Sequence, residues 1–372
     1  MQTRRIQRTL LAAAALLAVG TAQAQSSVVA YGLIDLAVNN FKAGDALGGT
    51  DVWKLVDGTQ NGFNGSRLGF RVSEDLGGGL RANALMEMGL LADTGALAQG
   101  GRGWGRQVYV GLSSASLGEV RFGRQYILED SVMAMATPWG NAAVNNTGTA
   151  VTNMGPVIGN GANSVPFWLN APRADNVLQY QTPSFGGFYV AAQIAPGEGT
   201  ADRFHGVKAA YQAGNLNVGT SYEWSKSRVN GDDVNKSLTI GANYNFGFMR
   251  LLGGYQKNDD LALGSGNGAF IGSTLTINVG GATPTFVANQ ISGYTVGAVF
   301  PFGALELGVN FTDMDYESAA GRTASLGKAA ATLRYNLSKN TFLYTGYSMS
   351  TGDLKERIYE SQVFQAGLRM AW

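Results

Sequence analysis

The sequence predicts an all-β protein: a sixteen-stranded antiparallel transmembrane β-barrel with one loop folded inward as a constriction. Three observations predict this fold. Short segments alternate apolar and polar residues along most of the chain, which is the side-chain period of a strand rather than of a helix. Short turns and long loops alternate strictly between these segments, as in outer-membrane barrels. Beyond residue 24, no apolar run reaches the roughly 18 residues that a membrane-spanning helix needs.

The closing segment, Val363–Trp372, shows the alternation most plainly. Phe364 and Leu368 belong to a face that is apolar throughout, whereas Gln365 and Arg369 belong to the opposite face, which is mostly polar. About ten residues tilted at roughly 45° cross the apolar layer of a thin membrane. This segment therefore has both the length and the two faces of a barrel strand between lipid and water.

Fifteen further segments repeat this design. Taken in chain order with the last one, the expected strands are Val28–Val38, Ser66–Ser73, Leu80–Leu90, Trp104–Leu112, Gly118–Gln125, Asp175–Thr182, Phe188–Ile194, His205–Gln212, Asn215–Trp224, Asn235–Phe246, Phe248–Lys257, Ile291–Pro301, Ala304–Asp313, Thr323–Asn336, Thr341–Ser350 and Val363–Trp372. The polar, Gly-rich residues 39–65 and 258–290 are expected to be long loops.

Residues 1–24 have the organisation of a secretory signal peptide. Three arginines precede the apolar run Leu10–Val19, and the small residues Ala22 and Ala24 form a cleavage signal. Cleavage after Ala24 leaves 25–372 as the mature barrel. It removes three of the 27 basic residues and none of the 26 acidic ones, so the mature net charge is −2.

Composition excludes several classes of function. No basic run remains in the mature chain, so we expect no nucleic-acid partner. The chain has no cysteine and a single histidine, His205, which argues against a metal site and against a Ser–His hydrolase. We therefore expect no metal, no cofactor and no enzymatic activity.

A soluble, secreted all-β binding protein is the alternative fold. Such a protein would bury the apolar faces of two sheets against each other and would usually mix turn lengths at both ends. Here aromatic residues gather at strand ends, as Tyr31, Phe246 and Trp372 do, where interfacial girdles of a membrane barrel would lie. Sixteen strands would enclose a water-filled lumen rather than a packed core.

One long segment, 131–172, contains no charged residue and no histidine. It begins directly after Glu129 and Asp130 and contains Pro138 and Trp139 among several prolines and aromatics. Disordered segments are normally charged and poor in aromatics, so this one is better suited to fold inward against the barrel wall. We expect it to narrow the lumen as a constriction loop.

Four arginines are candidates for the wall that faces this loop. Arg67 and Arg71 share the polar face of their strand, and Arg173 has the parity of polar residues farther along its own. Arg106 shares its parity with Val108, so it reaches the lumen only if its strand is turned that way. Clustered guanidinium groups in a wet channel favour anions. Alternatively, each arginine pairs with an acid of the wall and only stiffens the barrel: Asp35, Glu87, Glu119 or Asp175.

Several motifs together resemble the Gram-negative trimeric general porins of the beta-proteobacterial type, over the whole mature chain. They are Tyr31-Gly32-Leu33-Ile34-Asp35, Gly65-Ser66-Arg67-Leu68-Gly69-Phe70, Glu74-Asp75-Leu76-Gly77-Gly78-Gly79-Leu80, Gly105-Arg106-Gln107-Val108-Tyr109-Val110-Gly111-Leu112, Gly118-Glu119-Val120-Arg121-Phe122-Gly123-Arg124-Gln125-Tyr126 and Tyr180-Gln181-Thr182-Pro183-Ser184-Phe185-Gly186-Gly187.

The resemblance implies a homotrimer in the outer membrane, in contact with lipid and lipopolysaccharide, that passes small hydrophilic solutes and ions by passive diffusion. It implies an inward third loop with Pro138-Trp139-Gly140 at its tip, and a basic cluster that includes Arg67 and Arg106. It also implies that the terminal Trp372, where the family has Phe, is a signal for barrel-insertion machinery.

The chain departs from the family in its third loop, which often carries carboxylates facing the arginines. Residues 131–172 carry none, and only Glu129 and Asp130 precede them. This departure favours a modest preference for anions. A channel specific for one organic anion, with Trp139, Phe167 and Trp168 stacking on its ring, is the alternative.

Overall fold

Sixteen antiparallel strands form a closed barrel in the computed structural model, which describes residues 26–372 apart from 61, 141–172, 262–275, 279–284 and 359. The barrel strands are β1 (Ser26–Lys42), β3 (Arg67–Gly77), β4 (Leu80–Leu91), β6 (Gln107–Ser114), β7 (Gly118–Tyr126), β8 (Arg173–Gln181), β9 (Phe188–Ala195), β10 (Arg203–Ala213), β11 (Leu216–Lys226), β12 (Asp233–Asn245), β13 (Arg250–Asp259), β16 (Gln290–Phe302), β17 (Leu305–Glu317), β18 (Thr323–Asn336), β19 (Thr341–Thr351) and β20 (Gln362–Ala371).

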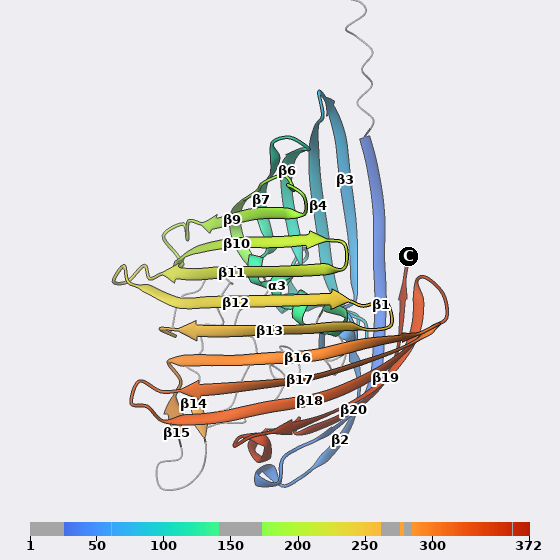
Figure 1. Ribbon diagram of the computed structural model, residues 1–372, viewed down its shortest axis with the longest axis vertical. Coiled ribbons are helices and arrows are strands. Elements are labelled where there is room, and N and C mark those ends of the chain that lie inside the picture. Colours follow the sequence, from blue (N-terminus) through green and yellow to red (C-terminus); the bar gives the residue numbers. More distant parts are fainter. Residues whose placement is uncertain (1–25, 61, 141–172, 262–275, 279–284, 359) are drawn as a thin grey trace, which may run out of the picture.

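Closure is made by the first and last strands. β1 pairs with β20 along the register Leu33↔Ala371 to Lys42↔Gln362, so the described sheet has no open edge at this seam. In lipid an open edge would leave backbone N–H and C=O groups unsatisfied, at several kcal/mol each. Figure 1 shows strands of the near side crossing those of the far side, as tilted strands around a barrel do. The fold predicted from the sequence is confirmed.

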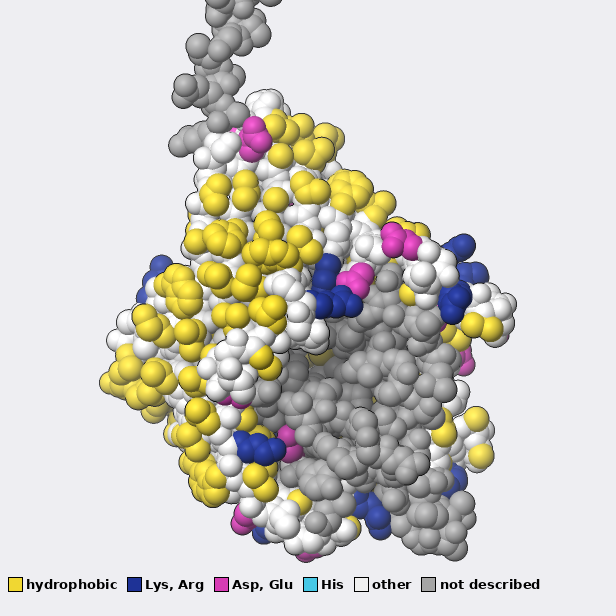
Figure 2. All heavy atoms as spheres, turned by 180° about the vertical axis from the view of Figure 1, so that it is seen from behind, with side chains coloured by type: hydrophobic (Ala, Val, Ile, Leu, Met, Phe, Trp, Pro, Cys, Tyr) yellow, Lys and Arg dark blue, Asp and Glu magenta, His cyan; other side chains and the backbone are white. Residues whose placement is uncertain are grey.

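The two faces of each strand have opposite surroundings. On β12, Leu238 and Ile240 are 37% and 41% exposed, whereas the intervening Thr239 is fully buried. On β20, Phe364 and Leu368 are exposed, whereas Gln365 is buried inside. Hydrophobic side chains accordingly spread over the outer face in Figure 2. Moving such a side chain from water into hydrocarbon stabilises it by about 1.5–3 kcal/mol, so the outer face is built for a membrane.

Turns and loops separate to opposite ends of the barrel. The short β3–β4 turn reverses at Gly77, Gly78 and Gly79, whose φ angles of 83°, 60° and 78° suit glycine. At the same end β1 begins opposite this turn, with Ser26 paired to Glu74, and β20 finishes beside the β18–β19 turn. Both ends of the described chain therefore lie on the short-turn side, which in outer-membrane barrels faces the periplasm.

Two expected loops contain additional strands. β2 (Asp51–Asp57) lies within residues 39–65 and pairs with the loop-side half of β1, where it continues the wall above β3. β14 (Thr276–Asn278) and β15 (Thr285–Val287) form a separate hairpin within 258–290. The two segments are long connections as expected, but they also contain these short strands, and β1 extends to Lys42, which the alternation in the sequence did not predict.

The remaining elements are short. They are β5 (Ala96–Leu97), α2 (Ala98–Gly101), α3 (Leu128–Ala136) and the 3-10 turns η2 (Asp45–Leu47), η3 (Gly58–Gln60), η4 (Pro138–Gly140) and η6 (Lys355–Arg357). Among the described residues, none of the helices has the length and apolar character required to cross a membrane. In Figure 1, α3 lies among the strands in the middle of the barrel.

Candidate functional site in the barrel lumen

The helix α3 lies on a row of glycines along the inner wall. Gly219 of β11, Gly241 of β12 and Gly254 of β13 are direct partners in the strand register. A Cβ atom at Gly241 would come within 2.1 Å of the carbonyl oxygen of Val132, and one at Gly254 within 2.6 Å of the Cβ of Ala136. Only glycine therefore allows the helix to approach these strands so closely.

Glu129 anchors the start of this helix to the same wall. Its carboxylate accepts hydrogen bonds from Oγ of Ser237, at 2.8 Å, and from Nε2 of Gln256, and its backbone N–H donates to Oε1 of Glu223 at 2.9 Å. Buried polar groups of this kind are costly unless they are hydrogen-bonded, and these bonds meet that need. The Glu129 carboxylate thus faces β11–β13 rather than the arginines.

The turn Pro138–Gly140 extends along the same wall as far as β17. Its first residue is buried, and the ring of Trp139 covers Gly308 of β17, where a Cβ atom would lie 2.5 Å from the ring. Nε1 of Trp139 donates to Oε2 of Glu306 at 2.7 Å. The described start of the predicted constriction loop is therefore tied to the inner wall from β11 to β17.

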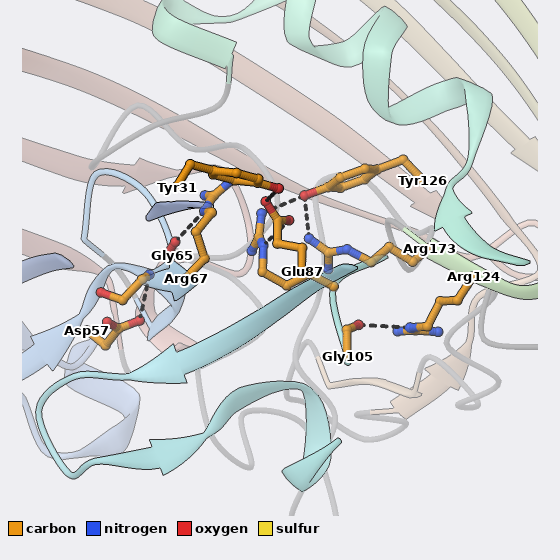
Figure 3. Close-up of polar contacts among 11 residues, drawn as sticks. Tyr31, Asp57, Gly65, Arg67, Glu87, Gly105, Arg124, Tyr126 and Arg173 are labelled. Carbon is orange, nitrogen blue, oxygen red and sulfur yellow. Dashed lines mark hydrogen bonds and ion pairs between the residues drawn. The ribbon is translucent and has the colours of Figure 1, made fainter. Parts of the chain in front are cut away.

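A basic cluster lies on the other side of the lumen, between β3 and β8 (Figure 3). Nε of Arg106 donates to Oε1 of Glu87 at 2.7 Å, and its Nη2 donates to the hydroxyl of Tyr126 at 2.6 Å. The hydroxyl of Tyr31 donates to the second oxygen of Glu87 at 2.9 Å. The side chains of Arg106 and Glu87 are 7% and 5% exposed, so this ion pair is part of the wall.

Arg67 and Arg173 carry positive charge without a paired carboxylate. Nε of Arg67 donates to the carbonyl of Gly65 at 2.9 Å, and Nη2 of Arg173 donates to the hydroxyl of Tyr126 at 2.5 Å. The Arg173 guanidinium also lies over the Tyr126 ring, 4.3 Å from its centroid. In the part of the chain that the structure describes, neither arginine has an acidic oxygen within ion-pair distance.

Asp130 is the carboxylate of α3 that faces this cluster. Its charge interacts with Arg173, Arg106 and Arg67, in that order of strength. Burial raises the pKa of Asp130 to about 6, although the three positive charges act in the opposite direction. One end of the helix therefore brings a single titratable negative charge to a wall of three arginines.

The charge of the site should consequently depend on pH. As the pH falls through about 6, Asp130 should gain a proton, and anion preference should rise because the arginines are then unopposed. Zero-current potentials in a salt gradient, recorded across this pH range, measure the change.

Asp130→Asn should show the higher anion preference at all pH values, with no change in preference near pH 6. His205→Gln, which removes the single histidine, should keep the change in preference. A change in anion preference near pH 6 that persists in Asp130→Asn would contradict the assignment of this pH dependence to Asp130.

The fourth candidate, Arg71, lies apart from the other three. Its guanidinium covers the ring of Tyr31, 5.1 Å from the centroid, and its side chain is exposed. The alternative of ion pairing with wall acids applies to one of the four candidates, Arg106, which is paired with Glu87. The other acids bind arginines that were not candidates: Glu119 binds Arg121 at 2.6 Å, and Asp175 binds Arg102 at 2.9 Å.

The Arg106 side chain reaches the lumen for a reason that the alternation of residues in its segment did not reveal. Its strand begins at Gln107 rather than at Trp104, so the alternation that places Val108 outside does not extend back to Arg106. The expected strand Trp104–Leu112 was thus too long at its start. Asp35, also named as a possible arginine partner, instead accepts a hydrogen bond from the Tyr344 hydroxyl at 2.7 Å.

Sequence reasoning missed the glycine row and the tyrosines that orient the arginines. The glycines could have been found, because Gly219, Gly241 and Gly254 fall on the polar, inward parity of three successive strands. It also missed Lys208 of β10, whose Nζ donates to Oγ of Ser131 at 3.0 Å and so ties the helix to a further strand. Within the described ranges, no cluster of His, Asp and Glu side chains is placed to hold a metal ion.

These features define a class of protein. A closed barrel with an apolar outer face, a polar lumen and a loop folded inside is a membrane channel. The model of the Gram-negative porin family matches residues 11–354, and the chain belongs to this family. It is an outer-membrane porin of a Gram-negative bacterium.

Individual relatives and solved structures are similar to this chain over most of its length. The chain is similar to an outer membrane porin protein of Bordetella pertussis, with 32% identity over 91% of this chain and 93% of that protein. Among solved structures it is similar to the anion-selective porin from Comamonas acidovorans, with a TM-score of 0.70 and 26% identity over 94% of this chain and 100% of the other. The trimer form of OmpT from Vibrio cholerae shares the fold, with a TM-score of 0.64 and 14% identity over 93% of this chain and 99% of the other.

Proposed function

We propose that this porin passes small hydrophilic solutes by passive diffusion and prefers anions. The observation that carries the preference is the pair Arg67 and Arg173, which face the lumen without a paired carboxylate, while Arg106 is neutralised by Glu87. Fixed positive charge in a narrow aqueous passage raises the local concentration of anions and lowers that of cations. The anion-selective porin from Comamonas acidovorans, at 26% identity, supports the same direction.

The passage proposed for these solutes lies between the arginine wall and the loop 131–172. Its described beginning, through Trp139, is held against β11–β17 and leaves the arginines on the facing side. We assign selectivity mainly to Arg67, Arg173 and Asp130, and a smaller share to the more distant Arg71. Glu129, Pro138 and Trp139 position the loop. Residues 141–172 lie outside the described residues, so their part in the constriction stays a prediction.

The biological setting follows from the same proposal. The mature chain begins after a signal peptide of residues 1–24, which lie outside the described residues. The trimer form of OmpT supports a homotrimer. The apolar outer face suits contact with lipid and lipopolysaccharide, and the aromatic Trp372 suits recognition by insertion machinery. The channel makes and breaks no covalent bond.

Swelling of proteoliposomes tests the proposal. Vesicles that contain the purified protein should swell rapidly in a neutral sugar and faster still in the anion of the corresponding sugar acid, because the two solutes differ mainly in charge. Vesicles with a short amine of similar size should swell more slowly. No swelling in the sugar would contradict a diffusion channel, and fastest swelling in the amine would contradict the anion preference.

A further inference from the structure

A second group of arginines lies near the short-turn end of the lumen. Arg250 opens β13 directly after a short turn, and Arg334 lies close to the end of β18. Arg369 of β20 reaches the β18–β19 turn, where its Nη1 donates to the carbonyl of Asn340 at 3.4 Å. β13 and β18 are far around the barrel from β3–β8, which carry the first cluster, whereas β20 is separated from β3 by β1 alone. We call Arg250, Arg334 and Arg369 the vestibule arginines.

Aromatic rings support two of these side chains. The guanidinium carbons of Arg334 and Arg369 lie 5.0 Å and 5.4 Å from the centroid of the same ring, that of Phe342. The two positive charges are therefore no more than about 11 Å apart, as both lie around one ring. Arg334 also lies 5.6 Å from the Trp139 ring and 5.9 Å from the Phe63 ring. These rings restrict the side chains, so their positions are set before any ligand arrives.

Among the residues that the structure describes, one carboxylate contacts the vestibule arginines directly. Nη2 of Arg334 donates to Oε1 of Glu306 at 3.0 Å, and the other oxygen of Glu306 accepts from Trp139. Arg250 interacts with Glu306 and Arg334 through their charges alone. Asp35 acts on Arg369 from a distance, but its own oxygens are bound by Tyr344 and Asn64. Three positive charges thus share one direct negative partner.

Hydrogen-bond donors are also left over. Within the described residues, the buried Nε atoms of Arg250, Arg334 and Arg369 have no acceptor. A buried donor without an acceptor is destabilising, so an anion that accepted from these atoms would recover part of that cost. The side chains of Arg334 and Glu306 are 20% and 22% exposed, so an ion in the lumen can reach the group.

We propose that the vestibule arginines form a second anion site, at the periplasmic end of the lumen, that binds small oxyanions with two negative charges. Guanidinium groups present paired N–H donors that match two oxygens of one oxyanion, which chloride cannot exploit in the same way. The hydrogen bond between Trp139 and Glu306 links this site to the start of the constriction loop. The inference rests on the proposed function, because it adds a second anion-binding site to the path along which anions are proposed to pass.

Block of chloride current by sulfate, added to one chamber at a time, tests this site. In Arg250→Gln/Arg369→Gln, the half-blocking sulfate concentration from the periplasmic chamber should rise about fivefold, because two charge-assisted contacts are lost in a wet vestibule. The value from the extracellular chamber should change by less than about twofold. This variant leaves Arg334, Glu306 and Trp139 in place.

A matched control removes two cations from the same end of the barrel but outside the cluster. Arg81→Gln/Lys339→Gln changes residues at the β3–β4 and β18–β19 turns and should leave both sulfate values unchanged. The orientation of inserted channels can be fixed with a single cysteine at Val229, which is 84% exposed in the β11–β12 loop of a chain without cysteine.

Three results would overturn the second site: an unchanged periplasmic value in the Arg250/Arg369 variant, an equal rise from both chambers, or an equal rise in the control. A wild-type channel that prefers cations would instead contradict the proposed function. The sidedness of sulfate block would still report on the vestibule arginines, so the two failures are distinguishable.

Discussion

Arg67→Gln/Arg173→Gln should remove most of the anion preference and bring the zero-current potential in a potassium chloride gradient close to zero. Each unit charge about 4 Å from a passing ion contributes about 1 kcal/mol even at the dielectric constant of water, so two contribute roughly 2 kcal/mol. The chloride-to-potassium permeability ratio should therefore fall by more than about tenfold. Neither side chain forms an ion pair with an acid in the described residues, and Arg106 remains to oppose the charge of Asp130 after both are replaced.

Two single variants test whether the position of an arginine matters, or only the loss of one positive charge. Arg71→Gln removes an exposed arginine outside the cluster and should shift the potential much less. Arg106→Gln should chiefly destabilise the barrel, by about 3–5 kcal/mol, because it leaves the buried Glu87 without its partner. Thermal unfolding followed by gel mobility measures this loss. A shift for Arg71→Gln as large as that for the double variant would contradict the assignment to Arg67 and Arg173.

Gly241→Val should displace α3 from the wall and change single-channel conductance by roughly twofold or more, because the narrow part of a pore limits its current. A Cβ atom alone would come within 2.1 Å of the Val132 carbonyl, so the helix or the strand must move. The helix should yield, since β12 is hydrogen-bonded to strands on both sides along its length. Overpacking of this kind costs about 1–3 kcal/mol, which a closed barrel can tolerate.

Gly253→Val is the matched control. Gly253 lies on β13 next to Gly254, but a Cβ atom there meets its nearest neighbour only at 3.4 Å, an ordinary contact. Conductance should remain that of the wild type, with the barrel formed normally. Equal conductance of Gly241→Val and wild type would show that the position of α3 does not limit the current.

The sequence predicts the barrel well because the membrane imposes one rule on every strand. An outward side chain must be apolar and an inward one can be polar, so alternation reveals both the strand and its faces. Leu238 and Thr239 of β12 illustrate the rule, with one exposed outside and the other buried within. The rule ends at the membrane boundary, which is why β2 and the true start of β6 at Gln107 were not predicted.

The lumen is less predictable, because its contacts join residues far apart in the sequence. Whether Arg106 pairs with Glu87, and whether Glu129 faces the arginines or the strands, depends on the path of a loop that has no periodic pattern. The residue types were recognisable, since four arginines and a charge-free loop could be read directly from the chain. Their pairing required the register of neighbouring strands and the position of α3.

The zero-current potential of the wild-type channel measures its selectivity between anions and cations most directly. With about a tenfold gradient of potassium chloride across a planar bilayer, an anion-preferring pore makes the dilute side negative, by at most about 59 mV. We expect a clearly negative dilute side near neutral pH. A positive dilute side would mean that cations pass more easily, and would contradict the arginine wall as the determinant of selectivity.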